Sequence, residues 1–136
     1  MPARWIPIAG ALLAAAGVGL GAFGAHGLED FLRRLGHEAD LAKRLAWYET
    51  AVRYQLFHAL ALLIVTALTA RNGAAGGLAA WLFVAGIALF SGSLYAMTFA
   101  GEAWRKLGMV TPLGGLALIA GWLALAVAAA KGERLQ

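Results

Sequence analysis

Four apolar segments, each about as long as a bilayer core is thick, constrain the fold of this chain more than any other feature. They cover residues 5–28, 48–70, 78–100 and 111–130. Because an α-helix rises about 1.5 Å per residue, about 20 apolar residues cross a hydrocarbon core of about 30 Å. The chain is 62% hydrophobic and 13% charged, and a soluble domain of this size has too little interior to bury so much apolar surface. We therefore predict an all-α membrane protein in which residues 1–136 form one four-transmembrane-helix bundle.

Two of the apolar segments have informative ends. In the first, Ala25, His26 and Gly27 resemble the small-x-small cleavage site of a signal peptide. The apolar stretch before them is longer than the ~7–15 residues of a signal-peptide core, so we expect a retained helix. In the fourth, Thr111 and Pro112 predict a helix N-terminus, because threonine caps free N–H groups and proline has no N–H to leave unpaired.

The polar segment between the first two apolar segments, residues 29–47, has a helical periodicity of its own. Its apolar residues recur at steps of three and four on both sides of Gly36. Two pairs of opposite charge lie four residues apart, Asp30 with Arg34 and Asp40 with Arg44. We predict a broken amphipathic helix on the membrane surface. An ordinary polar loop and a protein-docking face are the alternatives.

The basic residues, which give the chain a net charge of +4, lie in the segments around the apolar ones. This placement fits contact with lipid headgroups, and because no basic face or nucleic-acid motif is present we expect no nucleic-acid partner. Four spans put both termini at one end, with Arg4, Arg71, Lys131 and Arg134. The other end has Arg33, Arg34, Lys43, Arg44, Arg53, Arg105 and Lys106. The larger number of cations at the second end predicts that this end is cytoplasmic and that both termini are outside.

Two stripes of small residues predict close helix packing. The stripe on the first segment comprises Gly10, Ala14, Gly17, Gly21 and Gly24. The stripe on the fourth segment comprises Gly114, Ala117, Gly121, Ala124 and Ala128. Small residues let helix backbones approach closely in lipid, where the hydrophobic effect does not drive association. The stripes fit packing within one subunit or between subunits. Because four short helices offer little interior, we expect a homo-oligomer surrounded by membrane lipids.

Polar side chains inside the apolar segments form the candidate site. They are His26, Gln55, His58, Ser91, Ser93 and Tyr95. Polar groups at membrane depth cost free energy unless they have partners, so they normally face the bundle interior. His26 and His58 lie toward the same side of the membrane and could converge. Three hypotheses remain open: hydrogen bonds that fix helix packing, a path for a proton, ion or small solute, and a pair of axial haem ligands. Two histidines without a set spacing indicate haem only weakly, so we expect no cofactor.

The start of the second apolar segment has an ion pair, Glu49 with Arg53, four residues apart. A neutralised pair at the helix mouth is the simplest interpretation, and a gate or a headgroup contact is the alternative. The serines lack the context of a nucleophile elbow. The chain has no cysteine, which excludes disulfides and thiolate metal sites. We therefore expect no enzymatic activity and no metal site.

All six polar residues of the candidate site, and four of the six glycines in the two stripes, fall in five sequence blocks: residues 21–28, 54–62, 89–95, 111–115 and 121–122. The first block reads GAFGAHGL. Together these blocks resemble domain-of-unknown-function family 423, the YgdD/YwdK-like small membrane proteins. The resemblance implies four spans and a location in the bacterial inner membrane, but no activity, substrate or site residue. We expect an accessory or structural subunit that supports another membrane protein. A small oligomeric transporter or channel built around the polar group is the alternative.

Overall fold

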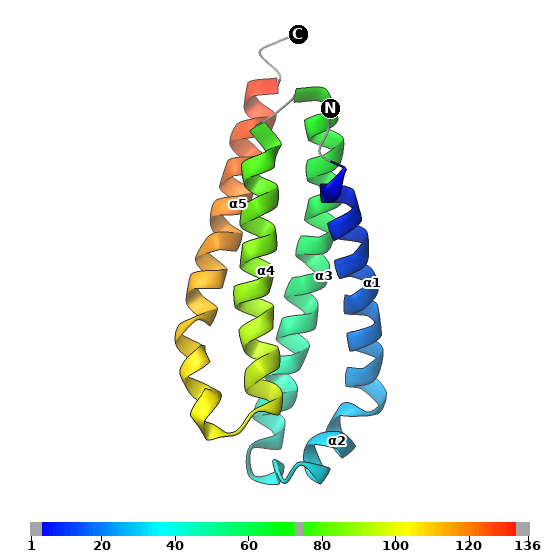
Figure 1. Cartoon of the computed structure of the whole chain (residues 1–136), viewed down its shortest axis with the longest axis vertical. Coiled ribbons are helices and arrows are strands. Elements are labelled where there is room, and N and C mark those ends of the chain that lie inside the picture. The colour runs from blue at the N-terminus through cyan, green and yellow to red at the C-terminus, as the bar shows by residue number, and fades with distance from the viewer. Residues whose placement is uncertain (1–3, 73–74, 133–136) are drawn as a thin grey trace.

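The computed structural model describes residues 4–72 and 75–132, which form four long antiparallel helices (Figure 1). These helices are α1 (Trp5–His26), α3 (Leu41–Asn72), α4 (Ala75–Phe99) and α5 (Thr111–Gly132). They are neighbours in chain order, so α3 and α4 lie in the middle. The end at which α1 finishes also has α2 (Leu28–Arg34) and two 3-10 helices, η1 (Glu38–Asp40) and η2 (Glu102–Met109). All four long helices are long and apolar enough to cross a membrane, which agrees with the predicted fold class.

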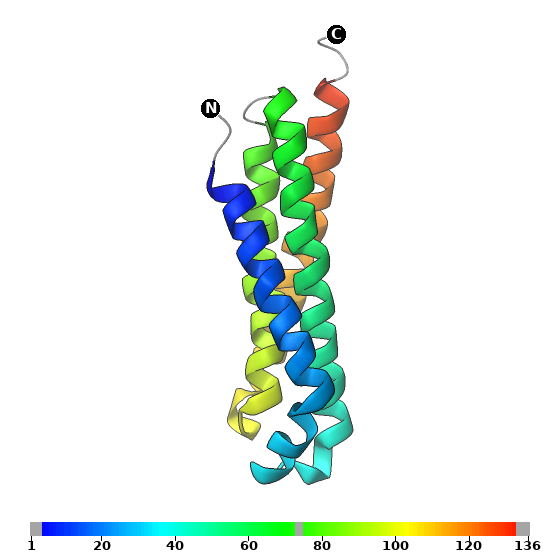
Figure 2. The same ribbon diagram turned by 90° about the vertical axis from the view of Figure 1, so that its right-hand side faces the viewer.

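The apolar core lies between α3 and α4, and one face of α1 and of α5 extends it. Its largest cluster comprises Ile6, Ala61, Leu62, Val65, Ala79, Ala80, Phe83, Ile87, Leu118 and Leu125. Of the apolar stretch of each helix, 44% is buried in α3 and in α4 but only 17% in α1, which crosses the bundle obliquely (Figure 2). The outer helices therefore present most of their apolar side chains outward, as lipid requires of a membrane protein.

Both small-residue stripes pack against helices of the same chain. A Cβ atom added to Gly17 of α1 would lie 2.7 Å from the side chain of Leu56 in α3. A Cβ atom added to Gly114 of α5 would lie 2.3 Å from the backbone nitrogen of Phe90 in α4. Of the two alternatives, the structure therefore supports packing within one subunit. The expected homo-oligomer stays a prediction, and the stripes no longer provide a reason for it.

The second half of the segment predicted to lie on the membrane surface does not form a separate helix. Instead, α3 begins at Leu41 and continues for 32 residues, so residues 41–47 are its first two turns. The sequence explains this continuity, because no glycine or proline interrupts residues 41–72 and the first turns are rich in Ala, Leu, Lys and Arg, which favour helix. The break lies earlier, at Gly36, whose φ of 81° is a left-handed conformation that glycine adopts without strain.

The first half of the same segment forms α2, which folds back onto the bundle. Leu28 and Leu32 are fully buried there and pack in a cluster with Tyr48 of α3. The predicted pair of Asp40 with Arg44 is present at 2.8 Å. In α2, however, the pair that forms is Glu29 with Arg33, at 2.7 Å, rather than Asp30 with Arg34. The helix therefore turns Leu28 and Leu32 to the protein, while Phe31 and Leu35 stay partly exposed and leave apolar surface at this end of the bundle.

The start of α5 confirms the predicted helix N-terminus, but the capping role predicted for Thr111 is not seen. The helix begins at Thr111, so this residue does not stand before it as a cap. The Thr111 hydroxyl instead lies 2.7 Å from the Ser93 hydroxyl of α4, and because Ser93 gives its one proton to the carbonyl oxygen of Phe90, Thr111 is the donor in this bond. The threonine thus bonds α5 to α4 rather than capping its own helix.

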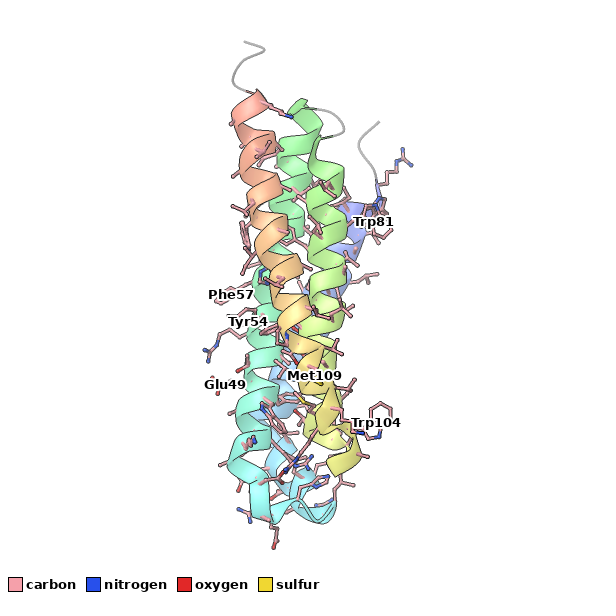
Figure 3. The ribbon with its side chains drawn as sticks, turned by 90° about the vertical axis from the view of Figure 1, so that its left-hand side faces the viewer. Glu49, Tyr54, Phe57, Trp81, Trp104 and Met109 are labelled. Carbon is pink, nitrogen blue, oxygen red and sulfur yellow. The ribbon has the colours of Figure 1, made fainter. Side chains whose placement is uncertain are left out.

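Tryptophans mark both ends of the bundle, where membrane interfaces are expected. The rings of Trp5 and Trp81 lie 4.6 Å apart at the end where α1 begins. The exposed Trp104 lies toward the opposite end (Figure 3). Arg134 and the side chain of Arg71, which the predicted sidedness uses, lie outside the described part of the structure. The sidedness therefore still depends on the sequence count.

Candidate functional site

One face of α3 makes hydrogen bonds to each of the other long helices. The side chains on it are Arg44, Tyr48, Gln55 and His58, all of them buried. They follow one another at steps of four, seven and three, which keeps them on one side of a helix. This face contains two of the six polar residues predicted as a cluster, Gln55 and His58, and Gln55 reaches a third, Tyr95 of α4.

Gln55 bonds two neighbouring helices at once. Its Nε2 donates to the carbonyl oxygen of Leu13 in α1 at 2.8 Å, and its Oε1 accepts from the Tyr95 hydroxyl of α4 at 2.9 Å. Two turns away, the Tyr48 hydroxyl donates to the carbonyl oxygen of Leu20 in α1 at 2.8 Å. Gln55 and Tyr95 therefore meet as predicted, and together they join α1, α3 and α4.

His58 is held between its own helix and α5. Its Nδ1 lies 2.7 Å from the carbonyl oxygen of Tyr54, and its Nε2 lies 3.1 Å from Nε1 of Trp122. An indole N–H can only donate, so Nε2 must be the acceptor and Nδ1 must bear the proton. Both ring nitrogens of this neutral tautomer are used, which leaves neither for a metal or a haem iron.

The serines of α4 also bond neighbouring helices. The Ser91 hydroxyl donates to the carbonyl oxygen of Ala51 in α3 at 2.8 Å. Ser93 lies against Thr111 of α5 and donates to the carbonyl oxygen of Phe90 at 2.9 Å. Among the described residues, every buried side-chain nitrogen or oxygen has a hydrogen-bond partner. Such interhelical bonds contribute only about 0.6 kcal/mol each on average, and here they join α4 to both α3 and α5.

Arg44 has a structural role that the sequence prediction missed. Its side chain is buried, and its Nη1 lies within 3.0 Å of the carbonyl oxygens of Met97, Thr98 and Ala100 at the end of α4. The last carbonyls of a helix have no hydrogen-bond partner within the helix, and they form the negative end of its dipole. A guanidinium supplies both the N–H donors and the positive charge that these carbonyls lack. The helical spacing of the polar residues could have revealed this role, because Arg44 precedes Tyr48 by four residues and therefore lies on the same face of the helix.

A groove opens between the last turns of α1 and the first half of α3. We call it the α1–α3 groove; its volume is about 850 Å³. Its lining residues are Gly21, Gly24, Ala25, His26, Gly27, Leu28, Glu29, Asp30, Leu45, Tyr48, Glu49, Val52, Arg53 and Leu56. The glycines leave room beside α3, and the charged residues stand at the end of the bundle that has Trp104. In Figure 3, Glu49 lies near the level of Trp104 and far from Trp81.

His26 belongs to this groove and not to the polar face of α3. It is exposed at the last residue of α1, whereas His58 lies among Tyr54, Phe83 and Trp122. The structure therefore does not bring the two histidines together. The haem hypothesis required such a meeting and loses its geometric basis. The predicted site residues divide into a bonded interior set and a groove set, His26, Glu49 and Arg53.

The charges of the groove are mostly acidic. The predicted ion pair of Glu49 with Arg53 is formed, with both side chains largely exposed. Glu29 accepts a hydrogen bond from Arg33 just outside the groove, and this contact raises the pKa of Arg33, so the guanidinium stays charged. Asp30 adds a third carboxylate to the lining. Against these three acids the described lining residues include one cation, Arg53, which makes the groove a site for a positive or zwitterionic group.

Comparison with known proteins identifies relatives along most of the chain. The sequence model of a family described as "Protein of unknown function (DUF423)" matches residues 20–115. The UPF0382 membrane protein YwdK of Bacillus subtilis is 45% identical over 126 residues, which cover 91% of this chain and 94% of the relative. A UPF0382 membrane protein of Haemophilus influenzae is 40% identical over 118 residues, 87% of each chain. No solved structure matches this chain.

Proposed function

This chain belongs to the DUF423 family of membrane proteins, a family of unknown function, and from its own geometry we propose that it is an accessory membrane protein that binds a phospholipid. The α1–α3 groove is the binding site, and the ligand has a zwitterionic headgroup with a free amine. The protein acts by binding and support, and it neither transports a solute nor catalyses a reaction.

The main support is the shape and depth of the groove. Ligand pockets commonly have volumes of about 300–1,000 Å³ and apolar walls with a few polar groups, and the groove of about 850 Å³ has this composition. Gly21, Val52 and Leu56 form an apolar floor, and the charged residues gather at one end. This arrangement suits an amphiphile whose acyl chain follows the helices and whose headgroup lies at the interface.

The charges of the groove favour an amine over a purely anionic headgroup. Asp30 and Glu49 attract an ammonium group, and Arg53 attracts the adjoining phosphate. A purely anionic headgroup would face three carboxylates, of which two are paired with Arg33 and Arg53, and repulsion from the third, Asp30, disfavours it. A zwitterionic aminophospholipid satisfies both signs of charge, so it is the occupant that this groove selects.

The transport alternative has less support from the interior residues. Gln55, His58, Ser91, Ser93 and Tyr95 all have direct hydrogen-bond partners. A path for protons or ions would use groups that remain free to exchange partners. Within the described residues, no group of three or more His, Cys, Asp or Glu is suitable for a metal. The geometry therefore favours a binding role, with the interior as a rigid support for the groove.

Two glycines of α1 provide a steric test with a matched control. A Cβ atom at Gly21 would lie 3.5 Å from Val52, so Gly21→Leu fills the groove floor without a forced clash. A Cβ atom at Gly19 would have no neighbouring atom within 4 Å, so Gly19→Leu adds the same side chain outside the groove. Native mass spectrometry of each protein, extracted from phosphatidylethanolamine bilayers, reports the lipid that stays bound.

We expect wild type and Gly19→Leu to retain phosphatidylethanolamine and Gly21→Leu to lose it. As a second variant, Asp30→Asn should lower retention by up to about fivefold, whereas Glu38→Gln, an exposed acid outside the groove, should not. Equal retention by Gly21→Leu and Gly19→Leu would refute the groove as the site. A preference of the wild type for phosphatidylglycerol at this groove would refute the headgroup assignment.

We further propose that the protein lies in the bacterial inner membrane with its α2 end in the cytoplasm. The relatives named above are bacterial, and the cations are more numerous at the α2 end. Because the chain has no cysteine, single cysteines can be labelled selectively. A membrane-impermeant maleimide added to spheroplasts should label Lys131→Cys and not Ala39→Cys. The reverse pattern would invert the orientation.

A further inference from the structure

A second cavity lies at the same end of the bundle, on a different side of α3. We call it the η2 pocket, because η2 forms one wall. Its volume is about 500 Å³. Lys43 and Trp47 come from α3, Leu94 and Met97 from α4, and Arg105 from η2. We propose that this pocket binds the phosphate of an anionic phospholipid, a lipid class that the α1–α3 groove disfavours.

The charges that line the η2 pocket are opposite to those of the groove. Its charged lining residues are Lys43 and Arg105, and none of the described residues that line it is an acid. Asp40 lies behind Arg105 and is shared, because its Oδ1 accepts from Arg44 at 2.8 Å and its Oδ2 accepts from Arg105 at 2.6 Å. One carboxylate thus serves two guanidiniums, and Lys43 adds another cation at the pocket. An anionic phosphate complements the two cations that line the pocket.

The shared carboxylate also fixes the position of Arg105. Arg44 is buried and anchored to the last carbonyls of α4, and it holds Asp40 through its Nε. Asp40 in turn holds one end of the Arg105 guanidinium. A guanidinium has five N–H donors, so the bond to Asp40 does not prevent it from binding phosphate. Because its orientation is set in advance, less conformational entropy is lost when a headgroup binds.

The pocket joins a headgroup-level cation to apolar surface, as a lipid site requires. The Lys43 ammonium lies 5.1 Å from the centre of the Trp47 ring, a cation–π geometry. This pair combines a lysine and a tryptophan, the residue types that collect at the headgroup level. Leu94 and Met97 continue the pocket with apolar side chains. A phosphate between the two cations would therefore place its acyl chains against α4, in the hydrocarbon layer.

The test compares lysines that differ in position but not in charge. Lys43 lines the pocket, whereas Lys106 is exposed next to Arg105 and outside the lining. The full-length protein is reconstituted in nanodiscs of phosphatidylcholine with a minor fraction of phosphatidylglycerol, and the lipid retained after extraction is measured by native mass spectrometry. Lys43→Gln should lower phosphatidylglycerol retention by about fivefold, the contribution of one cation near a membrane surface. Lys106→Gln should retain the wild-type amount.

Arg105→Gln is the second variant, and it should lower retention at least as much as Lys43→Gln. Neither variant should change the phosphatidylethanolamine retained by the α1–α3 groove when the protein is extracted from phosphatidylethanolamine bilayers, so failure at one site is distinguishable from failure at the other. Wild-type retention by Lys43→Gln would overturn the proposal, and so would equal losses in Lys43→Gln and Lys106→Gln. Inorganic phosphate that displaces phosphatidylglycerol at equal concentration would also overturn it, since the site would then recognise the free ion.

Discussion

The close approach of the α5 backbone to the α4 backbone at Gly114 offers a sharp test of the packing between these helices. A Cβ atom at Gly114 would lie 2.3 Å from the Phe90 backbone nitrogen and 2.8 Å from the Leu89 carbonyl carbon. Ordinary van der Waals contacts begin near 3.4 Å, so the methyl group of Gly114→Ala forces the two helices about 1 Å apart. The obstacle is backbone, which cannot rotate away as a flexible side chain can. The variant should therefore weaken the whole α4–α5 interface.

Gly115 is the matched control, because the nearest atoms to its added Cβ belong to the Phe90 ring at 3.7 Å, an ordinary contact. Overpacking costs about 1–3 kcal/mol of stability. Because the added methyl group meets backbone, the cost for Gly114→Ala lies at the upper end, about 3 kcal/mol. Alanine in a helix recovers about 1 kcal/mol relative to glycine. We therefore expect Gly114→Ala to destabilise the protein by about 2 kcal/mol, and Gly115→Ala to stabilise it by up to about 1 kcal/mol.

The assay is reversible unfolding in mixed micelles by increasing the fraction of sodium dodecyl sulfate, followed by circular dichroism. The expected difference between the two variants, about 3 kcal/mol, corresponds to a change of roughly a hundredfold in the unfolding constant. Each variant should be compared with wild type in the same micelles. Equal stabilities for Gly114→Ala and Gly115→Ala would refute the assignment of this stripe to the α4–α5 contact.

Two further predictions concern the polar face of α3. Arg44→Met should lower the free energy of unfolding in the same assay by about 3–5 kcal/mol, because the buried carbonyls at the end of α4 lose their partner and Asp40 loses one of its two. The exposed Arg53→Met should change it by less than about 1 kcal/mol, and similar effects would argue against the capping role. His58→Leu should cost only about 1 kcal/mol, since it removes an ordinary interhelical bond to Trp122. Liposomes with His58→Leu should show the same proton leak as wild type, and a pH-dependent flux that this variant abolishes would restore the transport hypothesis.

The sequence alone determined the fold class, for a physical reason. Lipid cannot satisfy backbone hydrogen bonds, so an apolar segment of bilayer length has to be helical. The polar face of α3 was partly readable as well, because helical periodicity places Gln55 and His58 on one side. Extending that stripe by one step would have included Arg44. The helix ends were less predictable, because the uninterrupted helix-forming residues from Leu41 onward allow α3 to begin there but equally suit a separate amphipathic surface helix.

Only the tertiary structure decided which groups meet across the bundle. A stripe of small residues fits a contact within or between subunits equally well, and the close approach of Gly114 to Phe90 selects the first. Likewise, the sequence gives the depth of a histidine in the membrane, but it does not give the rotation of its helix and therefore the neighbouring helix that the histidine faces. His26 therefore reached the α1–α3 groove while His58 reached Trp122. Both outcomes depend on helix rotation and crossing, which are set by packing contacts between residues far apart in the chain.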